Sequence, residues 1–209
     1  MQLVDAIGLL ENSKSWTADD QKGMAAWFTD WLHWLTTSKI GRGELDAKNN
    51  HGTWCDAQAA SIALFLGKTE MAHDLVSQAR EKRIAKQIEP DGRQPLELTR
   101  TTSFGYSMFN LRALMDVADI AHGLDVDLWH YQTKDGRSIL KATEFLANYA
   151  DPESKWPYQQ IHPANRGDLE EILRRAAVEF PESKPVKAAL KFFKGESGAS
   201  QLYLKIATQ

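Results

Sequence analysis

The sequence has very little cysteine, because Cys55 is the only one among 209 residues. A single thiol excludes an intramolecular disulfide, and it leaves a cysteine-based metal site without further cysteine ligands. The histidines other than His51 show no metal-ligand spacing, so we expect no metal site. Cys55 follows Trp54 at the start of a helical pattern, where we expect a buried and unreactive thiol.

An excess of either charge is also missing, because 28 acidic residues balance 25 basic ones to a net charge of −3. Such a balance carries no electrostatic signature of a nucleic-acid or anionic-membrane partner. No apolar run approaches the roughly 20 residues that cross a bilayer. Asp5 stands where a secretory signal has basic residues, so we expect no signal peptide within this chain. The choice of partner must therefore come from a local site.

What the sequence does have is helical periodicity. In residues 17–37, Thr17 and Asp20 are placed to form a capping box, and apolar residues recur at steps of three and four. Similar patterns predict helices at residues 54–66, 69–88, 103–121, 138–149, 167–179 and 185–193, with loops at 38–50 and 127–136. No segment shows the alternation of a strand. The predicted fold is all-α, one domain over residues 1–209 made of antiparallel helix hairpins around one core.

Two polar clusters stand out against this helical background. The first, residues 48–54, places Asn49, Asn50, His51 and Trp54 just before a predicted helix. An amide donor beside a titratable imidazole suits proton abstraction next to a carbonyl group. The second cluster consists of Glu97, Arg100, Ser103, Tyr106 and Asn110. Its last three members share one helix face, which we expect to line a groove.

Each of these residues also has an ordinary structural interpretation. Asn50 could cap the helix that follows. Arg100 could form a surface ion pair with Glu97. Tyr106 is of a type that is more often half-buried packing than an acid, and Trp54 suits core packing as well as stacking on a sugar ring. From the residues alone these alternatives stay open.

The two clusters occur within a longer series of motifs. They are NNHGTW at 49–54 with DAQ at 56–58, QIEPDG at 87–92, QPLEL at 94–98, RTTS at 100–103 with YS at 106–107 and NL at 110–111, DGRSI at 135–139 and WPY at 156–158. In this order they resemble the alginate lyase superfamily of polysaccharide lyases, over residues 3–161. Cys55 departs from the aromatic residue usual at its position.

The resemblance implies a helical toroid whose groove binds an acidic polysaccharide, such as alginate or glucuronan, and cleaves it by β-elimination. It also implies a periplasmic or secreted protein. Members are typically longer at the N-terminus, so we expect an incomplete (α/α) toroid. An apolar wall exposed in this way would favour a homo-oligomer.

The implied chemistry removes the C5 proton of a uronate, whose carboxylate must first be neutralised. Asn50 and Arg100 are the expected donors to that carboxylate. An imidazole ordinarily titrates near ~6.5 and a phenol near ~10, so His51 suits the base and Tyr106 the acid that protonates O4. If proton and leaving group share one face, Tyr106 serves both roles, with Arg100 lowering its pKa and His51 an orienting donor.

Further residues are expected to contact substrate, and no cofactor is required. The substrate contacts are assigned to Asn49, Trp54, Glu97, Ser103, Asn110 and Arg137. Two other function classes remain open beside the lyase. One is a remnant that binds acidic glycans without cleaving them, and the other is a glycoside hydrolase with Glu97 and Asp56 as its paired carboxylates.

Overall fold

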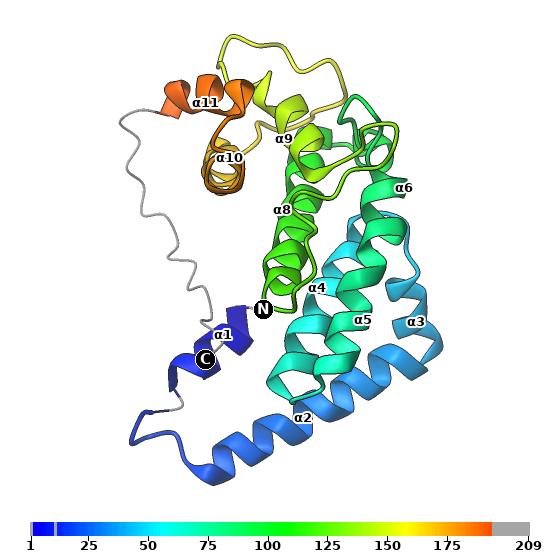
Figure 1. Ribbon diagram of the computed structural model, residues 1–209, viewed down its shortest axis with the longest axis vertical. Coiled ribbons are helices and arrows are strands. Elements are labelled where there is room, and N and C mark those ends of the chain that lie inside the picture. Colours follow the sequence, from blue (N-terminus) through cyan, green and yellow to red (C-terminus); the bar gives the residue numbers. More distant parts are fainter. Residues whose placement is uncertain (1, 11, 194–209) are drawn as a thin grey trace.

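The computed structural model describes residues 2–10 and 12–193, and they form helices joined by loops (Figure 1). The helices are α1 (Gln2–Leu10), α2 (Ala18–Thr37), α3 (Lys39–Leu45), α4 (Asn50–Phe65), α5 (Thr69–Ala79), α6 (Ala85–Gln87), α7 (Pro95–Leu98), α8 (Ser103–His122), α9 (Ile139–Ala147), α10 (Arg166–Glu179) and α11 (Lys184–Ala189). A π-helical turn (Arg80–Ile84) links α5 to α6, and a 3-10 turn (Leu190–Phe193) follows α11. Over these residues there is no strand, only an isolated bridge between Thr102 and Gln160. The all-α prediction is confirmed.

Three long helices form the centre of the molecule. Helix α4 packs against both α5 and α8, α2 crosses the lower end of the group, and α9 and α10 pack against α8 (Figure 1). A short turn at Leu66–Lys68 joins α4 to α5, so these two helices are antiparallel as predicted. The start of α5 lies beside the end of α8, where Thr69 and Gly123 line one cavity. Helices α4 and α8 therefore both begin at the opposite end.

The capping box predicted for the long N-terminal helix is present. Thr17 Oγ1 accepts from the backbone N–H of Asp20 at 3.2 Å, and Asp20 Oδ2 accepts from the N–H of Thr17 at 2.9 Å. Ser38 ends α2 and caps α3, since its Oγ accepts from the N–H of Gly41 at 2.9 Å. The predicted loop at 38–50 is therefore wrong over the residues of α3.

Helix α4 begins at Asn50, four residues before the predicted start. Its cap is Asn49, whose Oδ1 accepts from the N–H of His51 at 3.2 Å. The small residues on this helix permit the expected close approach of neighbours, because all four are fully buried: Ala57, Ala59, Ala60 and Ala63. The helix ends before Gly67, whose φ of +69° suits glycine.

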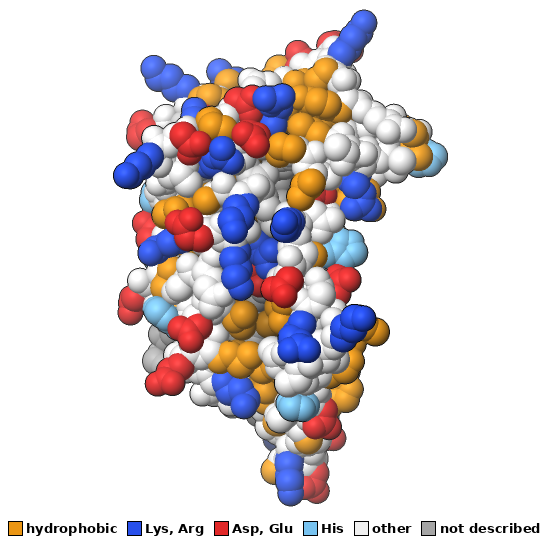
Figure 2. Space-filling model, turned by 90° about the vertical axis from the view of Figure 1, so that its right-hand side faces the viewer, with side chains coloured by type: hydrophobic (Ala, Val, Ile, Leu, Met, Phe, Trp, Pro, Cys, Tyr) orange, Lys and Arg blue, Asp and Glu red, His pale blue; other side chains and the backbone are white. Residues whose placement is uncertain are grey.

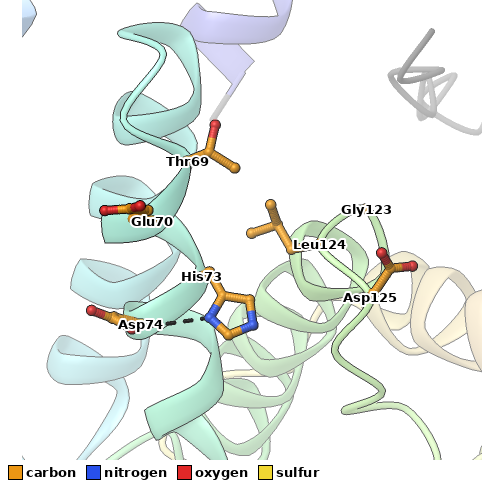
Figure 3. A pocket seen from close by; sticks show the side chains of 7 residues that line it. All are labelled: Thr69, Glu70, His73, Asp74, Gly123, Leu124 and Asp125. Atoms are coloured by element: carbon orange, nitrogen blue, oxygen red, sulfur yellow. Dashed lines mark ion pairs between the residues drawn. The ribbon is translucent and has the colours of Figure 1, made fainter.

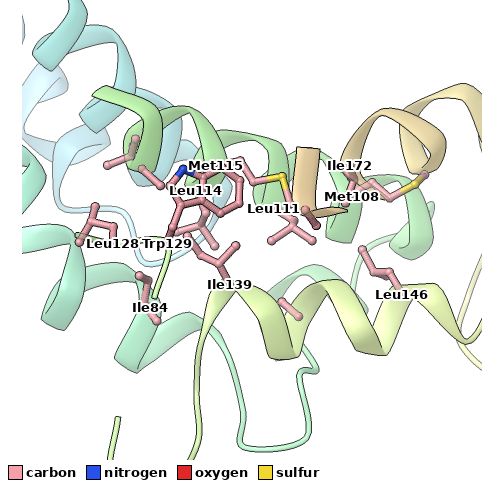
Figure 4. Packing of buried hydrophobic residues seen from close by; sticks show 14 of the residues in the cluster. Ile84, Met108, Leu111, Leu114, Met115, Leu128, Trp129, Ile139, Leu146 and Ile172 are labelled. Atoms are coloured by element: carbon pink, nitrogen blue, oxygen red, sulfur yellow. The ribbon is translucent and has the colours of Figure 1, made fainter. Parts of the chain in front are cut away.

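Buried hydrophobic residues form two clusters rather than the single core expected. The larger one joins α8 to α5, α9, α10 and α11 and includes Leu111, Met115, Ile139 and Ile172 (Figure 4). The smaller one packs α2 and α1 on α4, with Phe28 and Leu32 at its centre. Alanines of α4 belong to both clusters, so α4 couples the two halves.

Candidate active site

The first turns of α4 and α8 carry the two polar clusters, and the short helix α7 connects them. Glu97 of α7 accepts from the backbone N–H of Asn50 at 2.8 Å and from its side-chain Nδ2 at 2.6 Å. Arg100 follows α7 within three residues of Glu97 and precedes Tyr106 on α8. The fold thus brings residues 49–51 and residues 97–106 to the same end of the molecule.

Glu97 is the buried centre of this site, with 1% of its surface exposed. Burial raises the pKa of the Glu97 carboxyl above its ordinary value of 4.5, although the two hydrogen bonds from Asn50 and the charges of Arg100 and His51 oppose that rise. The charges of Arg100 and His51 therefore act on one carboxyl group. The hydrogen bonds from Asn50 to Glu97 are the contacts that bring the segments of His51 and Arg100 together.

His51 lies at the surface on the first turn of α4. Its side chain is 51% exposed, and Nδ1 lies 2.8 Å from Oε2 of Glu44, which comes from α3. The other ring nitrogen, Nε2, remains for a ligand. Glu44 was not singled out in the sequence, because it precedes His51 by seven residues across a helix boundary.

Arg100 and Tyr106 form a stacked pair. The guanidinium carbon of Arg100 lies 3.9 Å from the centre of the Tyr106 ring, which is the geometry of a cation–π contact. Both residues are partly exposed. Arg100 therefore lies over the ring face of Tyr106 and forms no direct ion pair with Glu97 among the contacts of the described residues, so the surface-pair interpretation of Arg100 is wrong.

The turn that carries Asn50 and His51 is held from beneath by a buried arginine. Arg83 of the π-helical turn is 2% exposed. It pairs with Asp56 at 2.7 Å and donates to the backbone oxygens of Ala47 and Leu45, each at 2.6 Å. A Cβ at Gly52 would overlap both the Ala47 oxygen and the Arg83 guanidinium. The glycine of the NNHGTW motif is therefore a packing requirement.

A network of buried amides joins the start of α4 to α8. Asn110 Nδ2 donates to the side-chain oxygens of Gln87 and Gln94, both at 2.8 Å. Gln87 also accepts from the Thr53 hydroxyl at 3.0 Å and donates to the Asn49 backbone oxygen at 3.3 Å. The two glutamines belong to the quoted motifs, but spacing alone did not indicate that they hold the site.

Several residues predicted to contact substrate are buried instead. Ser103 and Asn110 are fully buried, and Ser103 accepts from the Trp156 ring N–H at 2.8 Å while donating to the Gln159 backbone oxygen at 2.6 Å. Glu97 is occupied by Asn50. These contacts hold the three side chains inside the protein, although Asn110 Oδ1 is buried without a partner among the described residues. Their contact with substrate stays a prediction. Of the predicted polar stripe on α8, Tyr106 alone reaches the surface.

Arg137 is also a structural residue. Its guanidinium donates to the backbone oxygens of Ala85 and Ile88, at 3.2 and 3.1 Å, and pairs with Asp135 at 2.9 Å. These contacts fasten the loop before α9 onto the end of α6. Its side chain is 24% exposed, and the predicted substrate contact of Arg137 stays a prediction.

The remaining alternatives are decided by burial and pairing. Asn50 is inside α4 and does not cap it. Trp54 stacks on Phe109 with ring centres 4.9 Å apart, and its ring N–H is buried without a protein partner among the described residues.

Burial raises the pKa of the Cys55 thiol to about 11, as expected of an unreactive cysteine. Glu97 and Asp56 are both engaged by buried partners, which leaves no pair of free carboxylates for the predicted hydrolase.

A cavity of about 540 Å³ lies at the other end of the molecule, between the start of α5 and the turn after α8 (Figure 3). It is lined by Thr69, Glu70, His73, Asp74, Gly123, Leu124 and Asp125. None of the predicted site residues is among them. Within residues 2–10 and 12–193, no cluster of His, Cys, Asp or Glu has the composition of a metal site, and no helix is long and apolar enough to cross a membrane.

Comparison with known proteins identifies a family. A family model described as alginate lyase matches residues 1–156. The chain is similar to the solved structure of an alginate lyase from Bacteroides ovatus, with 42% sequence identity and a TM-score of 0.87. That likeness covers 91% of this chain and 51% of the other, so this chain spans about half the length of the structure that it matches. A search of curated proteins found no match.

Proposed function

This chain belongs to the alginate lyase family, and we propose that it cleaves a uronic-acid polymer of the alginate or glucuronan type by β-elimination. The observation that carries the proposal is the pair of hydrogen bonds from Asn50 to Glu97, because it brings the neighbouring His51 and Arg100 to one end of the molecule. His51 is exposed there and Arg100 is partly exposed, so a base and a cation are both accessible. That pairing matches the two demands of the reaction, neutralisation of the substrate carboxylate and removal of the C5 proton.

Arg100 is the main group that we assign to the substrate carboxylate. Its guanidinium is partly exposed and held in place by stacking on Tyr106. Asn50 is 2% exposed, and its Nδ2 already donates to Glu97, which leaves one N–H for a second acceptor. We therefore assign Asn50 the smaller share of the neutralisation.

Proton transfer is assigned to His51 and Tyr106, because both reach the surface at this end of the molecule. With proton and leaving group on opposite faces, His51 removes the C5 proton and Tyr106 protonates O4. With both on one face, Tyr106 serves both roles and His51 orients the substrate. Asn49 and Trp54 at the start of α4 remain proposed substrate contacts.

The polymer itself is proposed to be an acidic polysaccharide. In the face shown in Figure 2, Lys and Arg side chains gather at mid-height between areas of hydrophobic side chains. Lys82 and Lys86, which follow α5 and lie in the π-helical turn and α6, are exposed. Exposed positive charge of this kind suits a polyanion.

A second candidate function is binding of the acidic polysaccharide without cleavage. It is favoured by one observation, that the chain spans about half the length of the alginate lyase structure that it matches. A groove that needs both halves of such a structure would bind weakly and position the polymer poorly.

The experiment that tests the proposal is incubation with alginate, polymannuronate, polyguluronate and glucuronan while ultraviolet absorbance of an unsaturated uronate is followed. We expect absorbance to rise on one or more polymers, and to be abolished in His51→Ala and Tyr106→Phe. His73→Ala is the matched control, since His73 lies at the far cavity. A flat trace from the folded protein, with measurable retention on immobilised polyuronate, would favour the binding candidate.

A further inference from the structure

Glu44 and His51 come from different helices, yet their side chains meet at one well-defined contact. Oε2 of Glu44 lies 2.8 Å from Nδ1 of His51. Both helices are anchored where this contact forms. Arg83 binds the backbone oxygens of Leu45 and Ala47 just after Glu44. The amide cap from Asn49 fixes the backbone of His51. The backbone on both sides of the contact is therefore held in place, while the two side chains are 51% and 46% exposed.

We propose that Glu44 is a positioning residue that keeps Nδ1 of His51 protonated and so presents Nε2 as the base. A carboxylate only accepts hydrogen bonds, so the nitrogen that faces it is the one that donates. In a neutral imidazole the other nitrogen then carries the lone pair. As a statement about the reaction, the inference rests on the proposed function. The inference about which ring nitrogen of His51 carries the proton depends only on the contact with Glu44.

For a neutral ring, this arrangement selects one of the two open schemes. An orienting donor needs a proton on Nε2, and a neutral ring held by Glu44 has none there. His51 is then the base: the C5–H bond breaks, the proton moves to Nε2, and the electron pair forms the C4–C5 double bond. The C4–O4 bond breaks at the same time, and O4 takes the phenolic proton of Tyr106. Exchange with water afterwards restores both groups.

The charged groups around His51 suit that role. Glu44 faces it from α3, and Glu97 of α7 lies close enough for His51 to act on its carboxyl group. The Glu44 carboxylate, in contact with Nδ1, stabilises the positive charge that develops on the ring when Nε2 takes the proton.

Nitrogen-15 NMR of histidine-labelled protein tests the inference without any substrate. The His51 signals are identified by their loss in His51→Ala, and spectra are taken where the ring is neutral. We expect wild-type His51 to carry its proton on Nδ1. Glu44→Gln should keep that form, because the amide oxygen still accepts, whereas Glu44→Ala should lose it. Asp46→Asn is the control, since it removes a nearby exposed carboxylate at the end of α3.

Steady-state kinetics supplies the second readout. Loss of one hydrogen bond is expected to lower kcat in Glu44→Ala about 5- to 10-fold, with KM unchanged and with most activity recovered in Glu44→Gln. A wild-type ring protonated on Nε2, or a Glu44→Ala protein with unchanged tautomer and unchanged kcat, would overturn the inference. If the tautomer behaves as expected but no polyuronate is cleaved, the positioning by Glu44 is supported and the proposed reaction is contradicted.

Discussion

Gly52 shows how closely the site is packed at the scale of single residues. Its Cα faces the backbone oxygen of Ala47 and the guanidinium of Arg83, both of which a methyl group would overlap. Neither neighbour can move freely, because Arg83 donates to Ala47 and pairs with Asp56. The turn that presents Asn50 and His51 thus requires glycine at position 52, because no side chain fits there.

We predict that Gly52→Ala destabilises the protein by about 1–3 kcal/mol, the usual cost of forcing extra atoms into a packed site. Urea unfolding followed by circular dichroism measures the change. Gly43→Ala is the matched control, because a Cβ at this position of α3 meets no atom within 4 Å. The control should be as stable as the wild type or slightly more stable. Equal stability of the two variants would contradict the packing argument.

Glu97 gives a prediction about pH. Its pKa is raised in the folded protein by burial, so folding favours the protonated carboxyl. The resulting stability is fully present below about pH 4.5 and is lost as the pH rises through the higher folded pKa. Compared with Glu97→Gln, which stays neutral, the wild type should therefore gain relative stability as the pH falls from 7 through this range.

Unfolding free energies of the two proteins, measured across this pH range, check the prediction. Asp20→Asn supplies a control of opposite sign, because hydrogen bonds from Thr17 lower the pKa of Asp20 in the folded protein. Relative to Asp20→Asn, the wild type should lose stability as the pH falls. A parallel pH dependence of the wild type and Glu97→Gln would show that burial does not govern this carboxyl group.

Residue-scale features of the site were only partly predictable from the sequence. His51, Arg100 and Tyr106 were recognisable because their chemistry is unusual in combination and the motifs around them are specific. The burial of Ser103 and Asn110 was not predictable from the sequence, because polar residues at helical spacing ordinarily indicate an exposed face. Their partners, Gln87, Gln94 and the Gln159 backbone, are distant in the sequence, so the network that satisfies them appears only in the fold.

At the scale of elements, the π-helical turn between α5 and α6 positions the arginine that supports the site. The turn places Arg83 in the interior, where it forms a two-point contact with Asp56 of α4. Wider turns of this kind are frequent at functional sites. Through Leu45 and Ala47 the same side chain also holds the end of α3. One arginine thus connects three helical segments.

We predict that Asp56→Ala destabilises the protein by about 3–5 kcal/mol, because it leaves the buried guanidinium of Arg83 without its counter-ion. Thermal and urea unfolding measure this loss. Asp91→Ala is the matched control: Asp91 and Arg93 also lie 2.7 Å apart, but both are exposed. The control should unfold at nearly the wild-type midpoint. A loss in Asp56→Ala no larger than in the control would contradict the anchoring role of Arg83.

The helices themselves were largely predictable, since apolar periodicity and caps are local signals. The helices predicted at 17–37 and 103–121 are present within one or two residues. Helix α3 was missed because Gly41 and Gly43 indicate a loop, whereas Ser38 caps a helix there and Gly41 fits against the backbone of Leu35. The start of α4 was placed late because Asn49, Asn50 and Gly52 are residue types typical of loops, whereas Asn49 caps the helix and Asn50 and Gly52 lie within it.

At the scale of the whole molecule, α2 carries apolar side chains on its outer face. Trp27 and Trp34 are 53% and 45% exposed and stand seven residues apart, so they share one side of the helix. Ile40 at the start of α3 is 71% exposed. Apolar surface of this extent is typical of a contact face. The sequence indicated association on general grounds, but it did not show which helix carries the surface.

We predict that the protein self-associates at micromolar concentration and that the double variant Trp27→Ser, Trp34→Ser shifts it toward the monomer. Sedimentation velocity over a range of concentrations measures both. Val178→Ser is the control, since Val178 on α10 is 69% exposed and away from α2. A strictly monomeric wild type, or equal association of the wild type and the double variant, would argue against α2 as a contact face.

The central claim is that His51 and Tyr106 catalyse elimination at a uronate, and the mass of the products tests it most directly. Elimination adds no water, so the fragment masses sum to the mass of the polymer segment that was cleaved, and one fragment carries a C4–C5 double bond. We expect this result from the wild type on at least one polyuronate and intact polymer from His51→Ala. Fragments heavier by one water would contradict it, as would cleavage that persists without His51.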